Sequence, residues 1–226
     1  MDYILNIHTA TERAIVAICN GKTILDTMTN EDPKGHAAFL HEAIHKVLHN
    51  NDISIDSLNA IGVTNGPGSY TGIRVGLAAA KGLCYALQIP LITFSTLEAM
   101  AVSAIEEIKD KNAFYCPMID ARRMEVFTAL YDADINPVEQ PAAKILADGS
   151  YLEYLAARPI YFFGNGSAKL QNLIHDHQNA HFISSEIEAN GICKISFEKY
   201  KKCQFDSVAY AEPSYLKEFL FMQKQA

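Results

Sequence analysis

The spacing of hydrophobic positions changes several times along the first 110 residues. Three short apolar or alternating segments come first, and the dipeptide Asn20-Gly21 between the second and third is typical of a two-residue hairpin turn. A segment with helical spacing follows, and short apolar runs then alternate with longer helical ones. The pattern predicts strands at 3–8, 14–19 and 23–28, a helix at 34–50, a strand at 61–64, a helix at 70–87, a strand at 91–94 and a helix ending near residue 109.

The same order of elements recurs in the second half of the chain. The pattern there predicts strands at 113–119, 125–131 and 138–145, a helix at 151–157, a strand at 160–163, a helix at 169–176, a strand at 181–184 and a helix at 192–200. The two halves share the order βββαβαβα with negligible sequence identity. This is the order of a ribonuclease-H-like unit, and two units in tandem give an actin-like fold of the α/β class. We therefore expect a first lobe at 1–110, a second lobe at 111–209, and a segment 210–226 that packs back on the first.

Composition excludes some classes of protein. Hydrophobic residues make up 49% of the chain, which is ample for a core and excludes a disordered protein. The formal net charge of −7 disfavours a general nucleic-acid binder, because binding phosphates requires a large basic field. The five cysteines are scattered without metal-ligand spacing, so we expect free thiols in a reducing compartment. The absence of a signal-peptide pattern and of a long apolar run predicts a cytoplasmic protein.

The most informative motif is the glycine-rich stretch Asn65-Gly66-Pro67-Gly68-Ser69-Tyr70-Thr71-Gly72, between a predicted strand and a predicted helix. Backbone N–H groups at such a junction can hold an anion. The stretch is not a Walker loop, since Ile73 follows Gly72, and it is not a dinucleotide fingerprint, since three residues separate Gly68 from Gly72. The spacing favours a tight turn in which Ser69 or Thr71 caps the helix, with an anion site as the alternative.

Three histidines, His41, His45 and His49, recur every four residues on one predicted helix and share a face. Two such histidines can bind zinc, but no glutamate stands where an H-E-x-x-H motif requires it. A solvated helix flank is the favoured interpretation, and no metal site is predicted. The basic cluster at 194–202 is interleaved with aromatic residues; it indicates a solvated helix face, with contact to RNA as the alternative.

Four segments, in order along the chain, resemble motifs of one family. The glycine-rich stretch continues as Ile73-Arg74-Val75-Gly76 and closely resembles the signature of the TsaB family, formerly called YeaZ or glycoprotease-like. The other three segments are similar to the family's first hairpin turn, its second-lobe hairpin and its C-terminal motif: His8-Thr9-Ala10-Thr11-Glu12, Asp120-Ala121-Arg122-Arg123 with Glu125-Val126-Phe127, and Pro213-Ser214-Tyr215-Leu216-Lys217. The resemblance spans nearly the whole chain.

The resemblance implies a two-lobed actin-like fold and an accessory role. Members of this family are partners of the catalytic subunit TsaD and of the ATPase TsaE. The assembly transfers a threonylcarbamoyl group to N6 of adenosine 37 in tRNA. By resemblance, this chain would be a non-catalytic subunit that stabilises and activates TsaD. It would reach tRNA only through the complex, would form a homodimer when alone, and would hold no catalytic residue of its own.

Two departures from related sequences agree with a non-catalytic role. TsaD-type sequences carry two histidines, four residues apart, as metal ligands after the glycine-rich stretch, whereas the matching positions here are Thr96 and Met100. A hydroxyl and a thioether are poor replacements for imidazole at an iron or zinc site, which also disfavours the metalloprotease that the older family label suggests. Actin-like ATPases usually have an aspartate at the first hairpin turn, where this chain has His8, and this disfavours ATP hydrolysis.

The enzyme alternative is an actin-fold ATPase or kinase that binds ATP or ADP with Mg²⁺ between the lobes. Its candidate nucleotide-binding residues are Thr9, Asp120, Gly164, Asn165 and Gly166. The loop at 164–167 follows a predicted strand and opens a predicted helix, so it could contact adenine or ribose. It could equally be an ordinary turn.

The helix after the glycine-rich stretch has one face made almost entirely of small residues, namely Gly72, Val75, Ala79, Gly82 and Ala86. A bulky face is expected to cover the sheet: Ile73, Ala80, Leu83, Cys84 and Leu87. Glycine in a helix interior costs about 1 kcal/mol relative to alanine, and close approach of another helix is a physical reason for Gly82. The small face could pack on this chain's own helix at 34–50. Alternatively, as the resemblance implies, it forms with His41 and His45 the interface to TsaD or to a second copy.

Overall fold

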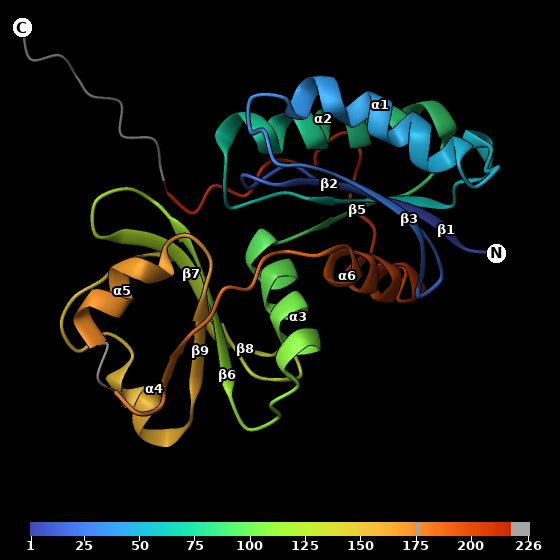
Figure 1. Ribbon diagram of the computed structural model, residues 1–226. Helices are drawn as coiled ribbons and strands as arrows, with labels where there is room; N and C mark the ends of the chain where they lie inside the picture. The colour runs from blue at the N-terminus through green and yellow to red at the C-terminus, as the bar shows by residue number, and fades with distance from the viewer. Residues whose placement is uncertain (175–176, 218–226) are drawn as a thin grey trace, which may run out of the picture.

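Two five-stranded sheets, each with helices packed on it, form the two lobes of the molecule (Figure 1). The computed structural model describes residues 1–174 and 177–217. The strand order of the first sheet is β3-β2-β1-β4-β5. The first three strands pair antiparallel, and the last two run parallel to the first: β1 (Tyr3–His8), β2 (Ala14–Asn20), β3 (Thr23–Asn30), β4 (Ala60–Thr64) and β5 (Leu91–Phe94).

The second sheet repeats this arrangement with the order β10-β9-β6-β7-β8. Its strands are β6 (Phe114–Asp120), β7 (Glu125–Tyr131), β8 (Pro137–Ile145), β9 (Ile160–Phe163) and β10 (Ala180–Phe182). Again the first three form an antiparallel meander and the last two run parallel to its first strand. Each half of the chain has the order βββαβαβα, so the predicted duplicated α/β fold is confirmed.

The helices complete three layers in the first lobe. Figure 1 shows α1 (His36–His49) and α2 (Tyr70–Leu87) on one face of the first sheet and α6 (Ala189–Lys201) on the other. Helix α3 (Thr96–Ile108) lies between the lobes and packs on both α6 and β6. The remaining helical segments are a 3₁₀ turn at Ile55–Ser57, α4 (Leu152–Ala157) and α5 (Ser167–Ile174). None of the helices in the described part of the chain has the length and apolar character needed to cross a membrane.

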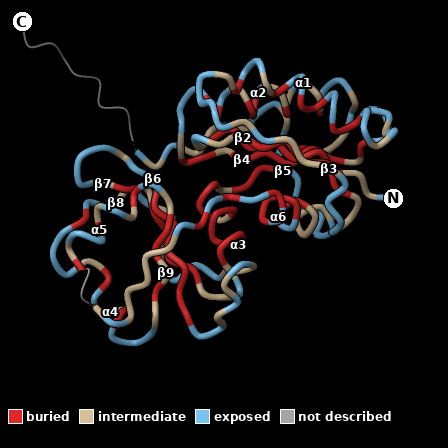
Figure 2. Tube along the Cα trace, viewed as in Figure 1, coloured by how far each residue is buried: buried red, intermediate tan, exposed pale blue. Residues whose placement is uncertain are grey.

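Burial is greatest in the central strands and in α3, as Figure 2 shows. One hydrophobic cluster lies between the first sheet and the pair α1 and α2. Another lies inside the second lobe, against α4 and α5. The largest surrounds α3 and α6 and includes side chains from both sheets, such as Ile4, Ile92 and Tyr115. The two lobes therefore share a continuous apolar core instead of meeting at a polar interface.

Helix α6 packs on the first lobe, whereas the sequence pattern predicts it in the second lobe. It falls within the predicted second lobe, 111–209, but it packs on the first sheet, against β1, β2, β4 and β5. Gly62 on β4 permits this contact, because a Cβ at that position would lie 2.8 Å from the Cβ of Ser196. The helix also begins at Ala189, three residues before the predicted start, and the strand that precedes it is shorter than predicted.

The described part of the segment 210–226, residues 210–217, lies against the first lobe. The Nζ of Lys81 donates to the carbonyl oxygen of Ala211 at 2.9 Å. The N–H of Ser214 donates to the carbonyl oxygen of Asn65 at 2.7 Å. Residues 218–226 lie outside the described residues, as does the end of the helix predicted at 169–176.

Candidate functional site

The glycine-rich stretch forms a turn that packs on the hairpin between β1 and β2. The Oγ of Ser69 accepts a hydrogen bond from the N–H of Gly72 at 3.2 Å and caps α2. The N–H of Ser69 donates to the carbonyl oxygen of Ala10 at 2.7 Å. A Cβ at Gly68 would lie 2.1 Å from that oxygen, and a Cβ at Gly72 would lie 2.0 Å from the carbonyl oxygen of Thr9. These glycines therefore serve close packing, which favours the predicted cap over an anion site.

The C-terminal motif rests on this same turn. Ser214 hydrogen-bonds to Asn65, as described above, and a Cβ at Gly66 would lie 2.7 Å from the carbonyl oxygen of Ser214. The Nε of Arg74 donates to the hydroxyl of Tyr215 at 2.9 Å, and its guanidinium lies 4.0 Å from the centre of the Tyr70 ring. Two motifs that are far apart in the sequence are therefore one packed unit.

The first hairpin turn is closed into the core of the first lobe. The Nδ1 of His8 lies 2.9 Å from the hydroxyl of Thr64, and its Nε2 lies 2.8 Å from the hydroxyl of Thr11. Burial, followed by electrostatic interaction with His36 and Arg13, lowers the pKa of His8 to about 3. The imidazole is therefore neutral and cannot take the part of a metal-binding carboxylate.

Thr9 is also engaged within the first lobe. Its hydroxyl donates to the carbonyl oxygen of Gly72 at 2.6 Å, and the side chain is buried. Gly166 in the second lobe is buried too, and its N–H donates to the carbonyl oxygen of Met118 at 3.0 Å. Neither residue lines the cleft between the lobes, and their contact with a nucleotide stays a prediction.

A cleft of about 530 Å³ does lie between the lobes, and it brings together other predicted residues. Asp120, Gly164 and Asn165 line its second-lobe wall, and Gly68 and Ser69 line its first-lobe wall. The Oδ1 of Asn165 accepts a hydrogen bond from the N–H of Asp120 at 2.9 Å. The turn predicted to face a ligand therefore does face the cleft, although the side-chain oxygen of Asn165 is already in use.

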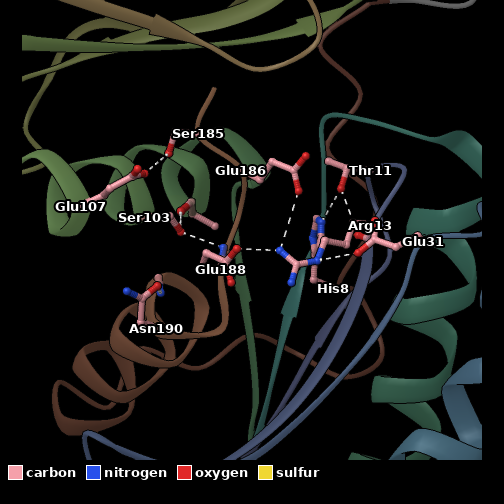
Figure 3. Close-up of polar contacts among 12 residues, drawn as sticks. His8, Thr11, Arg13, Glu31, Ser103, Glu107, Ser185, Glu186, Glu188 and Asn190 are labelled. Carbon is pink, nitrogen blue, oxygen red and sulfur yellow. Dashed lines mark hydrogen bonds and ion pairs between the residues drawn. The ribbon is translucent and has the colours of Figure 1, made fainter. Parts of the chain in front are cut away.

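The charges around this cleft are mostly negative. Its carboxylates are Glu12, Glu31, Asp120 and Glu186, and Arg13 is the basic member of the described lining residues. Figure 3 shows Arg13 between Glu31 on one side and the segment 185–188 on the other. Its guanidinium lies 3.0 Å from Glu31, 2.6 Å from Glu188 and 3.7 Å from Glu186. The charge of Arg13 is therefore balanced by carboxylates of the same chain. The cleft is electrostatically unfavourable for a polyphosphate.

Asp120 is also paired. The Nζ of Lys169 lies 2.8 Å from its carboxylate, and this hydrogen bond holds the pKa of Asp120 below its usual value. Close by, Lys217 forms an ion pair with Glu125 at the start of β7. The C-terminal motif thus touches both lobes. The carboxylate of Asp120 is exposed but already committed to a cation of this chain.

A second hollow, which we call the α1–α2 groove, lies on the opposite face of the first lobe from α6. Its volume is about 450 Å³, and its lining is apolar with a histidine rim: His41, Ile44, His45, Leu48, His49, Ile53, Ile55 and Leu83. The rings of His45 and His49 stack with their centres 5.8 Å apart. Within the described residues, no three His, Cys, Asp or Glu side chains come together as a metal site would require.

The small-residue face of α2 divides into two parts. Gly72 is buried against Thr9, and its contact with a partner stays a prediction. Val75 and Ala79 are half-buried, and Gly82 and Ala86 are exposed. No atom lies within 4 Å of a Cβ built on Gly82. The C-terminal half of this face therefore remains open beside the α1–α2 groove and does not pack on α1.

The basic cluster at 194–202 lies on α6 and just beyond it. Lys194 forms an ion pair with Glu106 on α3, and Lys22 on the neighbouring hairpin pairs with Glu198 at 3.1 Å. Acidic groups are thus interleaved with these lysines, in agreement with a solvated helix face.

Comparison with known proteins places the chain. A model of the family described as "TsaD: tRNA N6-adenosine threonylcarbamoyltransferase" matches residues 24–214. The "tRNA threonylcarbamoyladenosine biosynthesis protein TsaB" of Bacillus subtilis (strain 168) is 32% identical over 178 residues, which cover 76% of this chain and 75% of that protein. This chain belongs to the TsaB family.

Two further comparisons agree with this assignment. The protein of the same name from Escherichia coli (strain K12) is 35% identical over 135 residues, which cover 60% of this chain and 57% of that protein. A solved structure from Pseudomonas aeruginosa, described as similar to the peptidase YEAZ, superposes with a TM-score of 0.86 at 23% identity and covers 96% of this chain and 100% of that chain. The two-lobed actin-like fold expected for a TsaB-family chain is confirmed.

The positions where this TsaB-family chain departs from TsaD-type sequences are buried. Thr96 at the start of α3 is fully enclosed, and Met100, one turn later, is 5% exposed. Met100 also touches the second lobe, since a Cβ at Gly164 would lie 2.6 Å from its Cε. Packing at the contact between the lobes therefore encloses the two positions at which TsaD-type sequences would carry metal-ligating histidines.

Sequence reasoning missed two features of the site. Gly76, not singled out as a contact residue, lies against Thr9, and a Cβ there would lie 2.4 Å from the Thr9 hydroxyl oxygen. Leu83 was expected to cover the sheet but lines the α1–α2 groove. The helical spacing carried part of this signal, because Gly72, Gly76 and Ala80 form one row of small residues at four-residue intervals. No sequence pattern predicts the ion pairs of Arg13 with Glu186 and Glu188.

Proposed function

We propose that this chain is a non-catalytic partner of a TsaD-type catalytic subunit in the biosynthesis of threonylcarbamoyladenosine in tRNA. Its relatives are named for that biosynthesis, and the family model that it matches is described as the transferase. In this proposal a TsaE-type ATPase completes the assembly, tRNA is reached only through the complex, and the chain pairs with a second copy when alone.

The observation that carries this proposal is the α1–α2 groove with the open end of α2 beside it. An apolar hollow with a histidine rim adjoins exposed small residues, Gly82 and Ala86, over which another backbone can approach closely. A helix of the partner laid along this surface would bury Leu83 and the groove floor. The buried or paired state of His8, Thr96 and Asp120 supports a role without chemistry of its own.

The sharpest test of this interface is Gly82→Glu. The position is open, so a side chain fits the isolated chain, and losing glycine from a helix interior favours folding by about 1 kcal/mol. In the complex the carboxylate would be buried without a partner, so affinity for the TsaD-type subunit should fall at least 100-fold. Titration calorimetry and size-exclusion chromatography measure this, with circular dichroism confirming the fold.

The matched control is Ala168→Glu, the same kind of change at an exposed helical position in the second lobe. It should leave affinity unchanged. A reconstituted tRNA-modification assay, with each subunit omitted in turn, should require this chain together with the TsaD-type subunit. Wild-type affinity of Gly82→Glu would reject this surface as the interface, and modification of tRNA by this chain alone would reject the accessory role.

A nucleotide-binding enzyme is the second candidate, because Asp120, Gly164 and Asn165 do line the interlobe cleft. The surrounding carboxylates and the paired state of Arg13 argue against phosphate binding. Calorimetric titration of the full chain with ATP and Mg²⁺ separates the two. We expect no saturable heat, and a stoichiometric site abolished by Asp120→Asn would favour the enzyme.

A further inference from the structure

Two buried cysteines that are 174 positions apart in numbering meet beneath the first sheet. Cys19 on β2 is 0% exposed and Cys193 on α6 is 1% exposed. The side-chain amide nitrogen of Asn6 lies 3.4 Å from the sulfur of each. Both sulfurs contact this one amide group, one from the sheet and the other from α6. The fold therefore holds two thiols together across the contact between the sheet and α6.

The surroundings set Cys19 apart from the other buried cysteines. The interaction with Cys193 lowers the pKa of the Cys19 thiol, and Asn6 adds to this, although burial opposes both. By contrast, burial raises the pKa of Cys84 and of Cys116 to about 12. Because the thiolate is the nucleophile in thiol exchange, Cys19 is the buried cysteine best prepared to react.

Asn6 makes a second, independent contribution. Its amide nitrogen donates to the carbonyl oxygen of Ile4 at 3.2 Å as well as facing both sulfurs. Its side-chain oxygen is buried without a hydrogen-bond partner among the described residues. Burying an amide oxygen in this way is unfavourable, and the contacts of the amide nitrogen with Ile4 and with both sulfurs offset this cost.

We propose that Cys19 and Cys193 form a reversible disulfide between β2 and α6 when local opening of the contact between the sheet and α6 admits a small disulfide oxidant, R–S–S–R. The thiolate of Cys19 attacks one sulfur of the oxidant and releases R–S⁻. Cys193 then loses its proton and attacks the Cys19 sulfur of the mixed disulfide, releasing the second R–S⁻. The two protons of the cysteines end on the two released thiolates. The pair is oxidised by two electrons, and the oxidant is reduced to two thiols.

The test is disulfide mapping of the native full chain. Reduced protein is treated with oxidised glutathione, unfolded in the presence of N-ethylmaleimide, and analysed by non-reducing peptide mass spectrometry. We expect a linked peptide containing Cys19 and Cys193 that disappears on treatment with dithiothreitol. Cys84 and Cys116 should be alkylated. A glutathione adduct on the exposed Cys203 in the same sample would show that the oxidant is active.

Two variants sharpen the result. Cys193→Ser should replace the link by a glutathione adduct on Cys19, whereas Cys116→Ser, the matched change at another buried cysteine, should leave the link intact. Alkylation of both Cys19 and Cys193 in a wild-type sample whose Cys203 has reacted would overturn the proposal. So would a link that forms only when denaturant is present during oxidation. Both of these outcomes are read on the wild-type chain and need no variant to fold.

Discussion

Both ring nitrogens of His8 are hydrogen-bonded to threonine hydroxyls inside the first lobe. The pKa of about 3 in the folded chain lies well below the value of about 6.5 expected in the unfolded chain. Between these values the unfolded chain binds a proton at this residue and the folded chain does not. The stabilisation by neutral His8 is therefore complete above pH 6.5 and is lost progressively as the pH falls toward 3.

We expect His8→Gln to flatten the acid side of the stability profile. In the wild type, His8 should lower the free energy of unfolding by about 1.4 kcal/mol for each pH unit below 6.5. The variant lacks this contribution, so its free energy of unfolding should change less with pH. Urea denaturation at several pH values between 4.5 and 7.5 measures it. His49→Gln, at an exposed histidine, should keep the wild-type slope. Parallel profiles for the wild type and His8→Gln would contradict a neutral, buried His8.

Helix α2 contains three glycines, and the first and the last of them have opposite surroundings. Gly72, in its first turn, touches the backbone of the β1–β2 hairpin, whereas Gly82 has open space around it. The same residue type therefore allows close packing at one end of the helix and leaves a surface free at the other. The N-terminal end of α2 is therefore packed on the hairpin, and its C-terminal end has open space beside it in the described structure.

The pair Gly72→Ala and Gly82→Ala tests this difference within one helix. A methyl group at position 72 would lie 2.0 Å from a backbone oxygen that cannot move freely, so stability should fall by about 3 kcal/mol. The same change at position 82 should raise stability by up to about 1 kcal/mol. Chemical denaturation of both variants gives the comparison. Equal effects at the two positions would contradict the packing of the glycine-rich turn.

Much of the element order could be predicted from sequence, because hydrophobic spacing differs between strands and helices and the hairpin turns are marked. Ser69 as the cap of α2 was also predictable, since a side-chain oxygen before a helix meets unpaired N–H groups. The orientation of α2 was harder. Helical spacing separates faces but does not say which one the β1–β2 hairpin covers, so the packing of Gly72 on that hairpin was not predicted. Likewise, Asp120 and Asn165 were predicted as residues of the interlobe cleft. The ion pairs that Asp120 and Arg13 form there were not predicted.

At the scale of the whole molecule, a small number of polar contacts span the lobes in addition to the shared core around α3. Arg13 connects the β1–β2 hairpin to Glu186 and Glu188, and the N–H of Glu188 donates to the Oγ of Ser103 on α3 at 3.0 Å (Figure 3). Glu107 on the same helix accepts a hydrogen bond from Ser185 at 3.0 Å. The segment 185–188 is therefore held from two sides at the edge of the cleft.

Removing the cation should loosen this segment more than it weakens the fold. We expect Arg13→Gln to increase hydrogen exchange at residues 185–192, while the free energy of unfolding falls by no more than about 1 kcal/mol, because the carboxylates are partly exposed. Hydrogen-exchange mass spectrometry and urea denaturation measure the two effects. Lys22→Gln, which removes a more exposed ion pair, is the matched control and should leave exchange there unchanged. Unaltered exchange in Arg13→Gln would show that Arg13 does not hold the segment.

The return of α6 to the first sheet has a consequence for how the chain is made. A ribosome releases β1 to β5 long before residues 189–201, so the emerging first lobe has one face of its sheet uncovered while the whole second lobe is synthesised. The side chains on that face, Asn6 and Cys19 among them, are covered only after α6 has been synthesised. The nascent lobes therefore cannot fold one after the other, as separate domains usually do. Completion of the first lobe instead follows the synthesis of the second sheet.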